Sequence, residues 1–546
     1  DTQNNEDQQN STTQANTTAH TPPKNQEIDN TTTKTALNID PTRNKNYPLS
    51  TQQHADRLTK LAVILNRIGK PKEAIKHYTQ ALGLFEQLPH TTKNHAHCLT
   101  NLANTLHRTG RHKEALDRFT QALGVYQQLP HATEDHAKCL ASLATALSRI
   151  GDRQGAIERY TQALGLYQQL PHATEDHAIC LGSLANTLDD LGDRKGAIER
   201  YTQALGLFEQ LPHTTENHAR CLYNLASTLK ELGESEKAFE RYTQALGLFE
   251  QLPHTTEQQA DCFTNLATTL LNLGRHKEAI KHYTQALGLY QQLPHATEDH
   301  ANCLNNLATT FLNLDKPEEA LERYTQALGL YQQLPHATED HANCLNNLAN
   351  TLSDLGDHQE AIERYTQALG VYQQLPHPTE NHANCLYNLA LALDGTGERE
   401  GAIERYTQAL GVYQQLPHAT ERHADCLNNL ANTLHRTGRH KEAIDHYHEA
   451  LGLYQQLPHA TEGHAICLAS LANTLRGTGD RQGAIERYTQ ALGLFEQLPH
   501  ATENHAKCLT GLASTFLNLN LSKYEDKYEK AYGYYIQALG LYQQLP

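Results

Sequence analysis

The sequence predicts an all-α protein whose antiparallel helix pairs stack into an α-solenoid. Three observations predict this fold: a period of 41 residues, two amphipathic helical patterns within each period, and a glycine that separates the two patterns. A single helix pair cannot bury both of its apolar stripes, so consecutive pairs have to pack against one another.

The period is defined by the phrase QALG, which becomes EALG once and occurs twelve times. Successive copies are 41 residues apart, except for the last two, which are 47 apart. The copies begin at Gln80, Gln121, Gln162, Gln203, Gln244, Gln285, Gln326, Gln367, Gln408, Glu449, Gln490 and Gln537. Residues 49–546 therefore make up twelve predicted units, and the last carries a six-residue insertion around LSKYEDKYEK.

The composition agrees with duplication of one ancestral unit, because the 546 residues contain neither Met nor Trp. No apolar run approaches the roughly 18 residues of a membrane span, so no membrane partner is expected. The formal net charge of -16 and the lack of a continuous basic face argue against general nucleic-acid binding. Residues 1–48 contain 25 Thr, Asn or Gln residues, and such a segment predicts a disordered tail because it cannot bury enough apolar surface.

Each unit contains two helices, as the second unit illustrates. The apolar stripe of its first helix comprises Leu99, Leu102, Ala103 and Leu106. The stripe of its second helix comprises Ala115, Leu116, Phe119, Ala122, Leu123, Tyr126 and Leu129. Both stripes have the spacing of one face of an α-helix.

The boundaries of these helices follow from particular residues. Gly110 ends the first helix, and its equivalent is Gly in ten units and Asp315 or Asn520 in the other two, all residues that tolerate a left-handed backbone. Pro130 ends the second helix. Thr133 then provides an N-cap for the next helix, whose first turn is acidic.

The pattern L-x2-LA-x2-L, followed by Gly and then by A-x3-[YF]-x2-A, resembles a tetratricopeptide repeat (TPR) over residues 49–546. Leu99 stands where that repeat usually has Trp, Ala103 where it has Gly and Leu106 where it has Tyr. The long unit and the phrase CLNNLANTL are similar to the repeats of kinesin light chains and nephrocystin-3-like proteins. The resemblance implies a right-handed superhelix that serves as a docking surface. The loop QQLPHATEDH differs from the light-chain turn, so the resemblance does not extend to kinesin binding.

A histidine precedes a cysteine by three residues in ten of the eleven cysteine-containing units, as His136 precedes Cys139. This spacing suits either two metal ligands or a nucleophilic pair. Zinc, however, requires four ligands, and the next unit's set should lie about 10 Å or more away. A nucleophile would also need an oxyanion hole that opens to solvent. The interpretation favoured by the helical register is packing, with Cys as a small core residue and His at a helix start, and we expect no catalytic residue, metal or cofactor.

The same spacing argues against disulfides, because equivalent cysteines in stacked units should be farther apart than the ~7 Å that a bridge can span. Eleven free thiols favour a reducing compartment, and we expect the cytoplasm. The phrase HYHEALG resembles the start of a HExxH zinc motif, but Gly452 occupies the position of the second histidine.

The residues opposite the leucine stripe of each first helix are the candidate binding residues, since this face would line a concave groove. One position on it is Asn in seven units: Asn101, Asn224, Asn265, Asn306, Asn347, Asn388 and Asn429. An amide can donate to and accept from a peptide backbone, so a row of amides suits an extended polypeptide. The alternative is duplication of a harmless polar surface residue.

The predicted groove is uneven along its length. Basic residues occur near both ends, namely Arg108, Arg149 and Arg436. Apolar residues occur between them on or beside a face that should be wet, namely Tyr223, Leu271, Leu312, Tyr387 and Leu391. Exposed Tyr and Leu residues are plausible anchors for a partner, and the charges would set its register.

Two hypotheses follow for function. The first is a noncatalytic scaffold that binds an extended peptide or a helix of another protein in the concave groove. The second is the sensor arm of a larger signalling ATPase or protease, because the chain lacks an initiator Met and ends directly after a full unit without a polar capping helix. The identity of the partner and the oligomeric state are left open.

Gly124 and its equivalents lie in the middle of each second helix, where Gly costs up to about 1 kcal/mol relative to Ala. Either a neighbouring helix approaches closely at this glycine, or duplication has simply preserved it.

Overall fold

The computed structural model describes residues 50–129, 134–253, 256–295, 297–418, 420–459, 461–500, 502–519 and 526–544. The predicted N-terminal tail, residues 1–48, lies outside the described residues, as do Pro130, Thr133 and Asn520. The described chain contains α-helices and no strand, and it divides into two compact units, residues 1–151 and 152–546.

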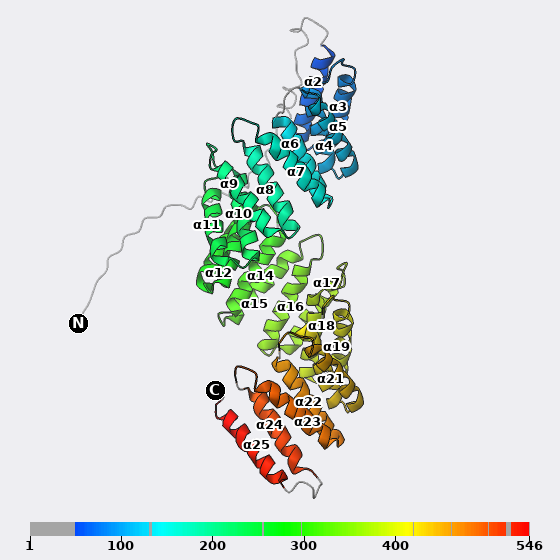
Figure 1. Ribbon diagram of the computed structural model, residues 1–546, viewed down its shortest axis with the longest axis vertical. Helices are drawn as coiled ribbons and strands as arrows, with labels where there is room; N and C mark the ends of the chain where they lie inside the picture. The colour runs from blue at the N-terminus through cyan, green and yellow to red at the C-terminus, as the bar shows by residue number, and fades with distance from the viewer. Residues whose placement is uncertain are drawn as a thin grey trace, which may run out of the picture. The chain divides into compact units, whose positions relative to one another are not determined.

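The first unit contains five helices (Figure 1). They are α2 (Thr51–Arg67), α3 (Pro71–Phe85), α4 (Lys93–Arg108), α5 (His112–Gln127) and α6 (Glu134–Arg149). Helix α2 packs against α3 and α4 against α5, while α3 contacts α4 and α5 contacts α6. Each helix therefore contacts the next one along the chain.

The second unit begins with α7 (Arg153–Tyr167) and continues as nine helix pairs. Its first helices are α8 (Glu175–Asp190), α10 (Glu216–Glu231), α12 (Glu257–Asn272), α14 (Glu298–Leu312), α16 (Glu339–Asp354), α18 (Glu380–Thr396), α20 (Glu421–Arg436), α22 (Glu462–Thr478) and α24 (Glu503–Leu517). The second helices are α9 (Arg194–Phe208), α11 (Ser235–Phe249), α13 (His276–Tyr290), α15 (Pro317–Tyr331), α17 (His358–Tyr372), α19 (Arg399–Tyr413), α21 (His440–Tyr454), α23 (Arg481–Phe495) and α25 (Lys527–Tyr542).

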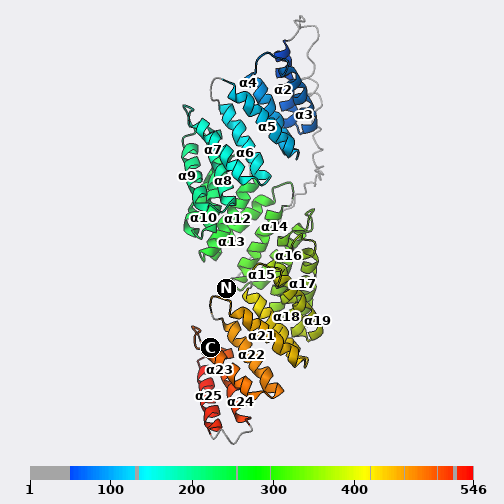
Figure 2. The ribbon, with the colours of Figure 1, turned by 45° about the vertical axis from the view of Figure 1, so that its right-hand side comes forward.

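Every second helix from α7 to α23 packs against the first helix that follows it, so the pairs of this unit form a continuous stack, and Figure 2 shows consecutive pairs side by side. First helices of neighbouring pairs also contact one another, for example α10 with α12 and α18 with α20. Their second helices make no comparable contact within the described residues. The first helices therefore share one inner face, and the α-solenoid predicted from the repeat is confirmed.

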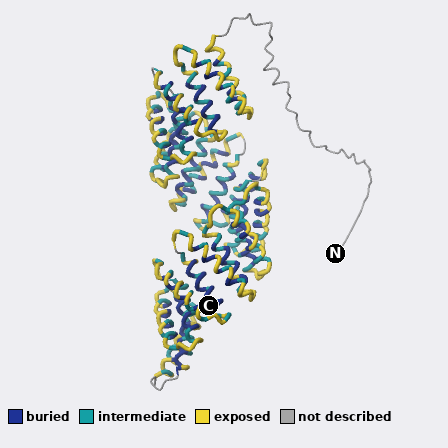
Figure 3. Tube along the Cα trace, turned by 90° about the vertical axis from the view of Figure 1, so that its right-hand side faces the viewer, coloured by how far each residue is buried: buried dark blue, intermediate teal, exposed yellow. Residues whose placement is uncertain are grey.

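The core of a pair is built from the predicted stripes. In α8 and α9, Leu184 and Tyr201 are only 4% and 2% exposed. The hydroxyl of Tyr201 donates to Asn186 Oδ1 at 2.6 Å, so its polar atom is satisfied. Figure 3 shows the resulting pattern: buried positions recur along the helices, and exposed positions mark their other faces and the turns.

The helix ends also follow the sequence. Thr174 accepts a hydrogen bond from the backbone N–H of His177 at 3.2 Å, which confirms the threonine N-cap at a described copy. Gly110 has a φ of 81°, and the N–H of the next residue donates to the Leu106 carbonyl at 2.9 Å, which closes the helix in a Schellman arrangement. Asp315 adopts the same left-handed conformation, with a φ of 57°.

The mid-helix glycines are not sites of close approach. A Cβ added to Gly288 in α13, or to its equivalents Gly124, Gly165 and Gly206, would meet no neighbouring atom within 4 Å. The structure therefore contains no packing reason for glycine at this position, and duplication remains as the explanation.

We expect Gly288→Ala to raise the free energy of unfolding by up to about 1 kcal/mol, because alanine costs less backbone entropy in a helix. Its control is Gly274→Ala in the same unit, where the φ of 71° should make alanine destabilising by about 1 kcal/mol. Urea unfolding followed by circular dichroism measures both changes. Destabilisation by Gly288→Ala would contradict the duplication explanation.

Candidate functional site

The repeated histidine and cysteine form the seam between consecutive pairs. His177 at the start of α8 stacks on Tyr167 of α7, with ring centroids 5.2 Å apart and planes inclined by 8°. One turn later, Cys180 Sγ donates to the backbone carbonyl of Tyr160 at 3.9 Å. Equivalent stacks join His136 to Tyr126, His218 to Phe208, His300 to Tyr290, His341 to Tyr331, His382 to Tyr372, His423 to Tyr413, His464 to Tyr454 and His505 to Phe495.

The electrostatics of the seam do not suit a nucleophile. Burial raises the pKa of the Cys180 thiol to about 12 and lowers the pKa of the His177 imidazole. All eleven cysteines are buried and free, and Cys139 has a pKa raised to about 11 by burial. A thiol with such a pKa stays protonated near neutral pH, so the packing role predicted for His136 and Cys139 is confirmed.

Metal-ligating side chains are spread along the stack. Within the described residues, no three His, Cys, Asp or Glu side chains come together in a group that could hold a metal ion. None of the described helices has the length and apolar character that would let it cross a membrane.

The predicted asparagine row lies on the inner face, but several of its amides are already used inside the protein. Asn224 and Asn388 donate from Nδ2 to Asn186 and Asn350 of the preceding first helix, at 3.0 and 3.1 Å. Asn429 donates to Tyr387 Oη at 2.8 Å. Asn388 Nδ2 also donates to Asn346 at 3.4 Å. These bonds tie neighbouring first helices together, and they leave the side-chain carbonyl oxygen of each of the three amides for other partners.

Among the asparagines of the row, Asn265 makes the most hydrogen bonds within the described residues. Its Nδ2 donates to Tyr223 Oη at 3.0 Å and to the Asp261 carbonyl at 3.1 Å, while its Oδ1 accepts from Lys230 Nζ at 2.7 Å. The contacts of Asn306 and Asn347 are longer, at 3.5 Å to Asn305. Some amides of the row therefore form hydrogen bonds between first helices, and only the remaining amide groups are open to a ligand.

The predicted anchors differ in accessibility. Leu391 is 40% exposed, and Tyr223, Leu271 and Leu312 are half-buried. The exposure predicted for Tyr387 is wrong, because this residue is only 7% exposed: its ring packs against Tyr406 with centroids 6.0 Å apart, and its hydroxyl accepts from Asn429.

The predicted basic residues also differ. Arg108 and Arg149 in the first unit are exposed, as expected. Asn101 of the same unit is half-buried. Arg436 on α20 forms an ion pair with Asp394 on α18. Its charge is therefore already offset within the protein, and it does not make the inner face basic as predicted.

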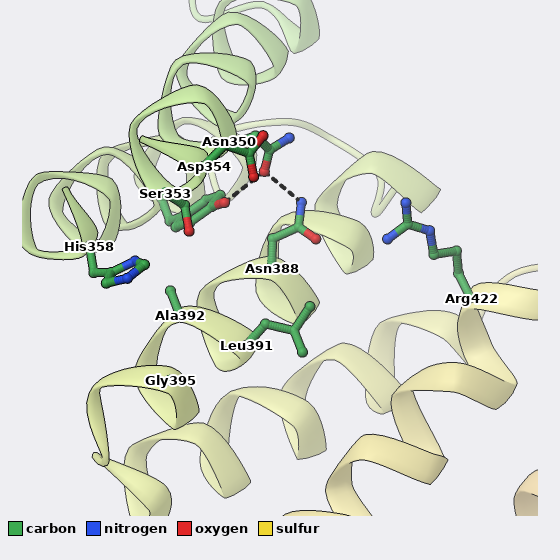
Figure 4. A pocket seen from close by; sticks show the side chains of 10 residues that line it. Asn350, Ser353, Asp354, His358, Asn388, Leu391, Ala392, Gly395 and Arg422 are labelled. Atoms are coloured by element: carbon green, nitrogen blue, oxygen red, sulfur yellow. Dashed lines mark hydrogen bonds between the residues drawn. The ribbon is translucent and has the colours of Figure 1, made fainter. Parts of the chain in front are cut away.

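A pocket opens on the inner face between α16, α18 and α20, with His358 and Tyr365 of α17 also in its lining, and we call it the Leu391 pocket (Figure 4). Its cavity volume is about 390 Å³. The lining includes Asn350, Asp354, Asn388, Leu391, Ala392 and Arg422. Figure 4 shows Asn388 Nδ2 bonded to Asn350 while its Oδ1 points away from Asn350, toward the Arg422 side of the pocket. The pocket thus combines a small apolar wall, formed by Leu391 and Ala392, with polar groups on its other sides, among them an amide acceptor, the Asp354 carboxylate and a guanidinium.

Sequence reasoning missed a second polar position on the first helices, directly before the cysteine. Asn343 and Asn384 accept from the hydroxyls of Tyr372 and Tyr413, each at 2.6 Å, and Asp261 accepts from Tyr290 at 2.5 Å. The sequence carries a signal for this pairing. Where the position before the cysteine is Ile179 or Ile466, which cannot accept a hydrogen bond, the residue 29 positions later is Phe208 or Phe495 instead of Tyr. These pairs lock a second helix to the first helix of its own pair.

Asp261 is the electrostatic exception in this set. Burial raises its pKa to about 6, the Tyr290 hydrogen bond opposes the rise, and the nearby carboxylates of Asp299 and Glu257 add to it. The pKa of Asp299 is raised as well, first by burial and then by Glu257. This part of the inner face is therefore acidic.

Comparison with protein families gives repeated matches. A family model described as a tetratricopeptide repeat matches residues 55–128, 176–251, 258–333, 340–415 and 423–497. Two further models with the same description match residues 387–458 and 139–174. A comparison with curated proteins gave no match.

Three solved structures are among those to which this chain is similar. BtubC (BKLC) from P. vanneervenii is 22% identical, with 40% of this chain and 88% of that chain covered and a TM-score of 0.36. A tetratricopeptide repeat protein from Parabacteroides merdae is 16% identical, with 55% and 99% covered and a TM-score of 0.38. The nearly identical TPR-like repeats of a putative kinesin light chain from Podosopora anserina are 17% identical, with 35% and 92% covered and a TM-score of 0.32.

We expect the thiols of the folded chain to react slowly with Ellman's reagent at pH 8, because burial keeps them protonated and inaccessible. The same eleven thiols should all react rapidly in 8 M guanidinium chloride, as a result of unfolding. Absorbance at 412 nm measures the reaction. Rapid reaction of several thiols in the folded chain would contradict their assignment to the seam.

Asp261→Asn should stabilise the protein increasingly as pH rises. The folded pKa of Asp261, about 6, lies above the ordinary value, so the folded state binds this proton more tightly and the contribution is lost as pH rises through about 6. Asn keeps the acceptor for Tyr290, as Asn343 does for Tyr372. The variant's advantage in unfolding free energy should grow by about 2 kcal/mol between pH 4 and pH 7.5.

Urea unfolding of the wild type and the variant at four pH values measures this difference, and the subtraction removes the titration of the histidines. Asn343→Asp is the matched control and should show the opposite sign. A difference that does not change with pH would contradict the raised pKa.

Proposed function

Because the chain belongs to the tetratricopeptide repeat family, whose members generally mediate protein–protein interactions and are generally noncatalytic, we propose that it is a scaffold that binds an extended segment of a partner protein along the inner face of its first helices. The observation that carries this proposal is the Leu391 pocket, which lies on the inner face and combines an exposed leucine with polar groups suited to a backbone.

The polar groups of the inner face support an extended partner. Where Asn224, Asn388 and Asn429 donate to the first helix of the preceding pair, each keeps a carbonyl oxygen that can accept from a peptide N–H. These amides repeat along the stack with the period of the units. An extended segment presents its own N–H and C=O groups at regular intervals, so it can use several such amides in succession.

The unequal residues of the inner face support selectivity. Half-buried Leu271 and Leu312 lie at equivalent positions of α12 and α14, while Asp261 and Asp299 make the start of these helices acidic. In the first unit, exposed Arg108 and Arg149 give that unit's own first helices basic groups. Within either unit, such side chains would orient a partner segment, because charge complementarity sets register more than affinity.

The test is to select binding peptides and to locate them. A phage-displayed library of random peptides is panned on the immobilised full chain, and selected peptides are synthesised with a photo-crosslinking residue. We expect the crosslinks, mapped by mass spectrometry, to fall on first helices. Crosslinks confined to second helices would contradict the inner-face site.

Variants sharpen the same test. Asn388→Ala should weaken peptides that crosslink near α18 by about tenfold, because one backbone hydrogen bond is lost. The control is Gln367→Ala on α17, an exposed residue of a second helix, which should leave the affinity unchanged. Fluorescence anisotropy measures both affinities. Equal weakening by the two variants would indicate a general loss of folding instead of a lost contact.

A further inference from the structure

The Leu391 pocket exists because one unit departs from the repeat at three neighbouring positions. Leu391 replaces the residue that is Asn350 in the preceding unit and Asn432 in the next. Ala392 stands where those units have Thr351 and Thr433. Gly395 also lines the pocket, and the equivalent residues are Asp354 and Arg436. Each departure removes a polar or larger side chain, so together they create both the space and its apolar wall.

The first departure weakens the fold locally. In neighbouring units, the second-helix tyrosine donates to this position: Tyr365 to Asn350 at 2.6 Å and Tyr447 to Asn432 at 2.7 Å. The equivalent Tyr406 is fully buried, and its hydroxyl has no hydrogen-bond partner within the described residues, because Leu391 offers none. A buried hydroxyl without a partner is unfavourable, and an exposed leucine adds no burial in return.

A second unsatisfied atom lies on α18, the helix that carries Leu391. Asp394 is bonded through Oδ2 to Arg436, but its buried Oδ1 lacks a partner within the described part of the chain. Duplication alone would have copied the stable Asn-Thr-Leu sequence, which precedes and follows this unit as NTL. The LAL sequence at residues 391–393 therefore departs from the repeat. It lowers stability locally, and at the same place it enlarges the cavity on the inner face.

We propose that the Leu391 pocket binds one bulky apolar side chain of the extended partner segment, whose backbone passes between Asn388 and Arg422. This inference rests on the proposed function and adds the residue type that the site selects. Leu391 and Ala392 supply the apolar contact. Asn388 Oδ1 accepts from a backbone N–H, and the Arg422 guanidinium, which lies 5.6 Å from the Tyr387 ring centroid, donates to a backbone carbonyl.

The occupant follows from the distribution of polar groups. Asn388 and Arg422 lie beside the apolar wall and offer polar groups to a partner. These groups suit the peptide backbone, which every segment carries whatever its sequence. Sequence selectivity then comes from the side of the cavity formed by Leu391 and Ala392, which gives a side chain apolar contact and no hydrogen-bond partner. The other sides carry polar groups, including Asn350, Asp354 and His358, and the whole cavity, at about 390 Å³, is large enough for Leu, Ile, Met or Phe.

The experiment uses the full chain and peptides selected from the phage-displayed random library. Peptides that crosslink to α18 should share one position occupied by Leu, Ile, Met or Phe. Replacing that residue by Ser should weaken binding by about tenfold or more, and Leu391→Asn and Ala392→Thr should each do the same. The control Leu355→Asn, at an exposed leucine outside the pocket lining, should leave the affinity unchanged.

A stability readout separates this role from simple unfolding. Leu391→Asn should raise the melting temperature while it weakens the peptide, because Asn restores a partner for the Tyr406 hydroxyl as Asn350 does for Tyr365. Ala392→Thr restores the residue of the neighbouring units and should leave the melting temperature unchanged or higher.

The outcomes distinguish the two proposals. If peptides crosslink to first helices but bind both pocket variants as tightly as the wild type, the pocket inference is overturned and the proposed function stands. If crosslinks fall on second helices, or if no peptide is enriched, both are overturned. Selected peptides without a shared apolar position would also overturn the pocket inference.

Discussion

The structure depends on the seam between the second helix of one pair and the first helix of the next. At each described seam of the second unit, buried alanines and leucines meet, and with one exception a histidine stacks on a tyrosine or phenylalanine; Gln259 replaces the histidine at the α11–α12 seam. The cysteine adds a hydrogen bond to a carbonyl of the preceding helix. Because one pair leaves an apolar face uncovered, stability comes from adding such seams, and this explains why their residues change so little between units.

The seam and the inner face have opposite requirements. Residues that repeat, such as the cysteine and the threonine N-cap, satisfy a packing or backbone demand that is the same in every unit. Residues on the inner face have weaker structural demands, so differences between units can accumulate there. The asparagine row belongs to both classes, because Asn265 is fully used by internal hydrogen bonds while Asn388 keeps its carbonyl oxygen toward the pocket. A repeated polar residue on this face is therefore not by itself a ligand-binding residue.

The sequence predicts the helices, their ends and their stacking because each depends on contacts that recur at a fixed period, as with Gly110 and its equivalent Asp315. The burial of Tyr387 and the Arg436–Asp394 ion pair were not predicted, because they join first helices of adjacent units through side chains about one period apart. The unpaired Tyr406 hydroxyl could have been predicted once the repeat was aligned: its partner position lies 15 residues earlier, where Leu391 replaces a residue able to accept. The pocket itself required the structure, since its lining comes from four helices.

A repeat array can retain such a costly departure because its stability is shared among neighbouring seams. An unpaired buried hydroxyl costs about 1–3 kcal/mol, which would be a large fraction of the stability of a small domain. In this stack the seams on both sides of α18 and α19 keep their alanine, cysteine and tyrosine contacts, so the loss is confined to one unit. Local instability on the inner face is thus tolerated without loss of the fold. In an array made by duplication, the residues that depart from the repeat at an energetic cost are the ones for which a function has to be sought.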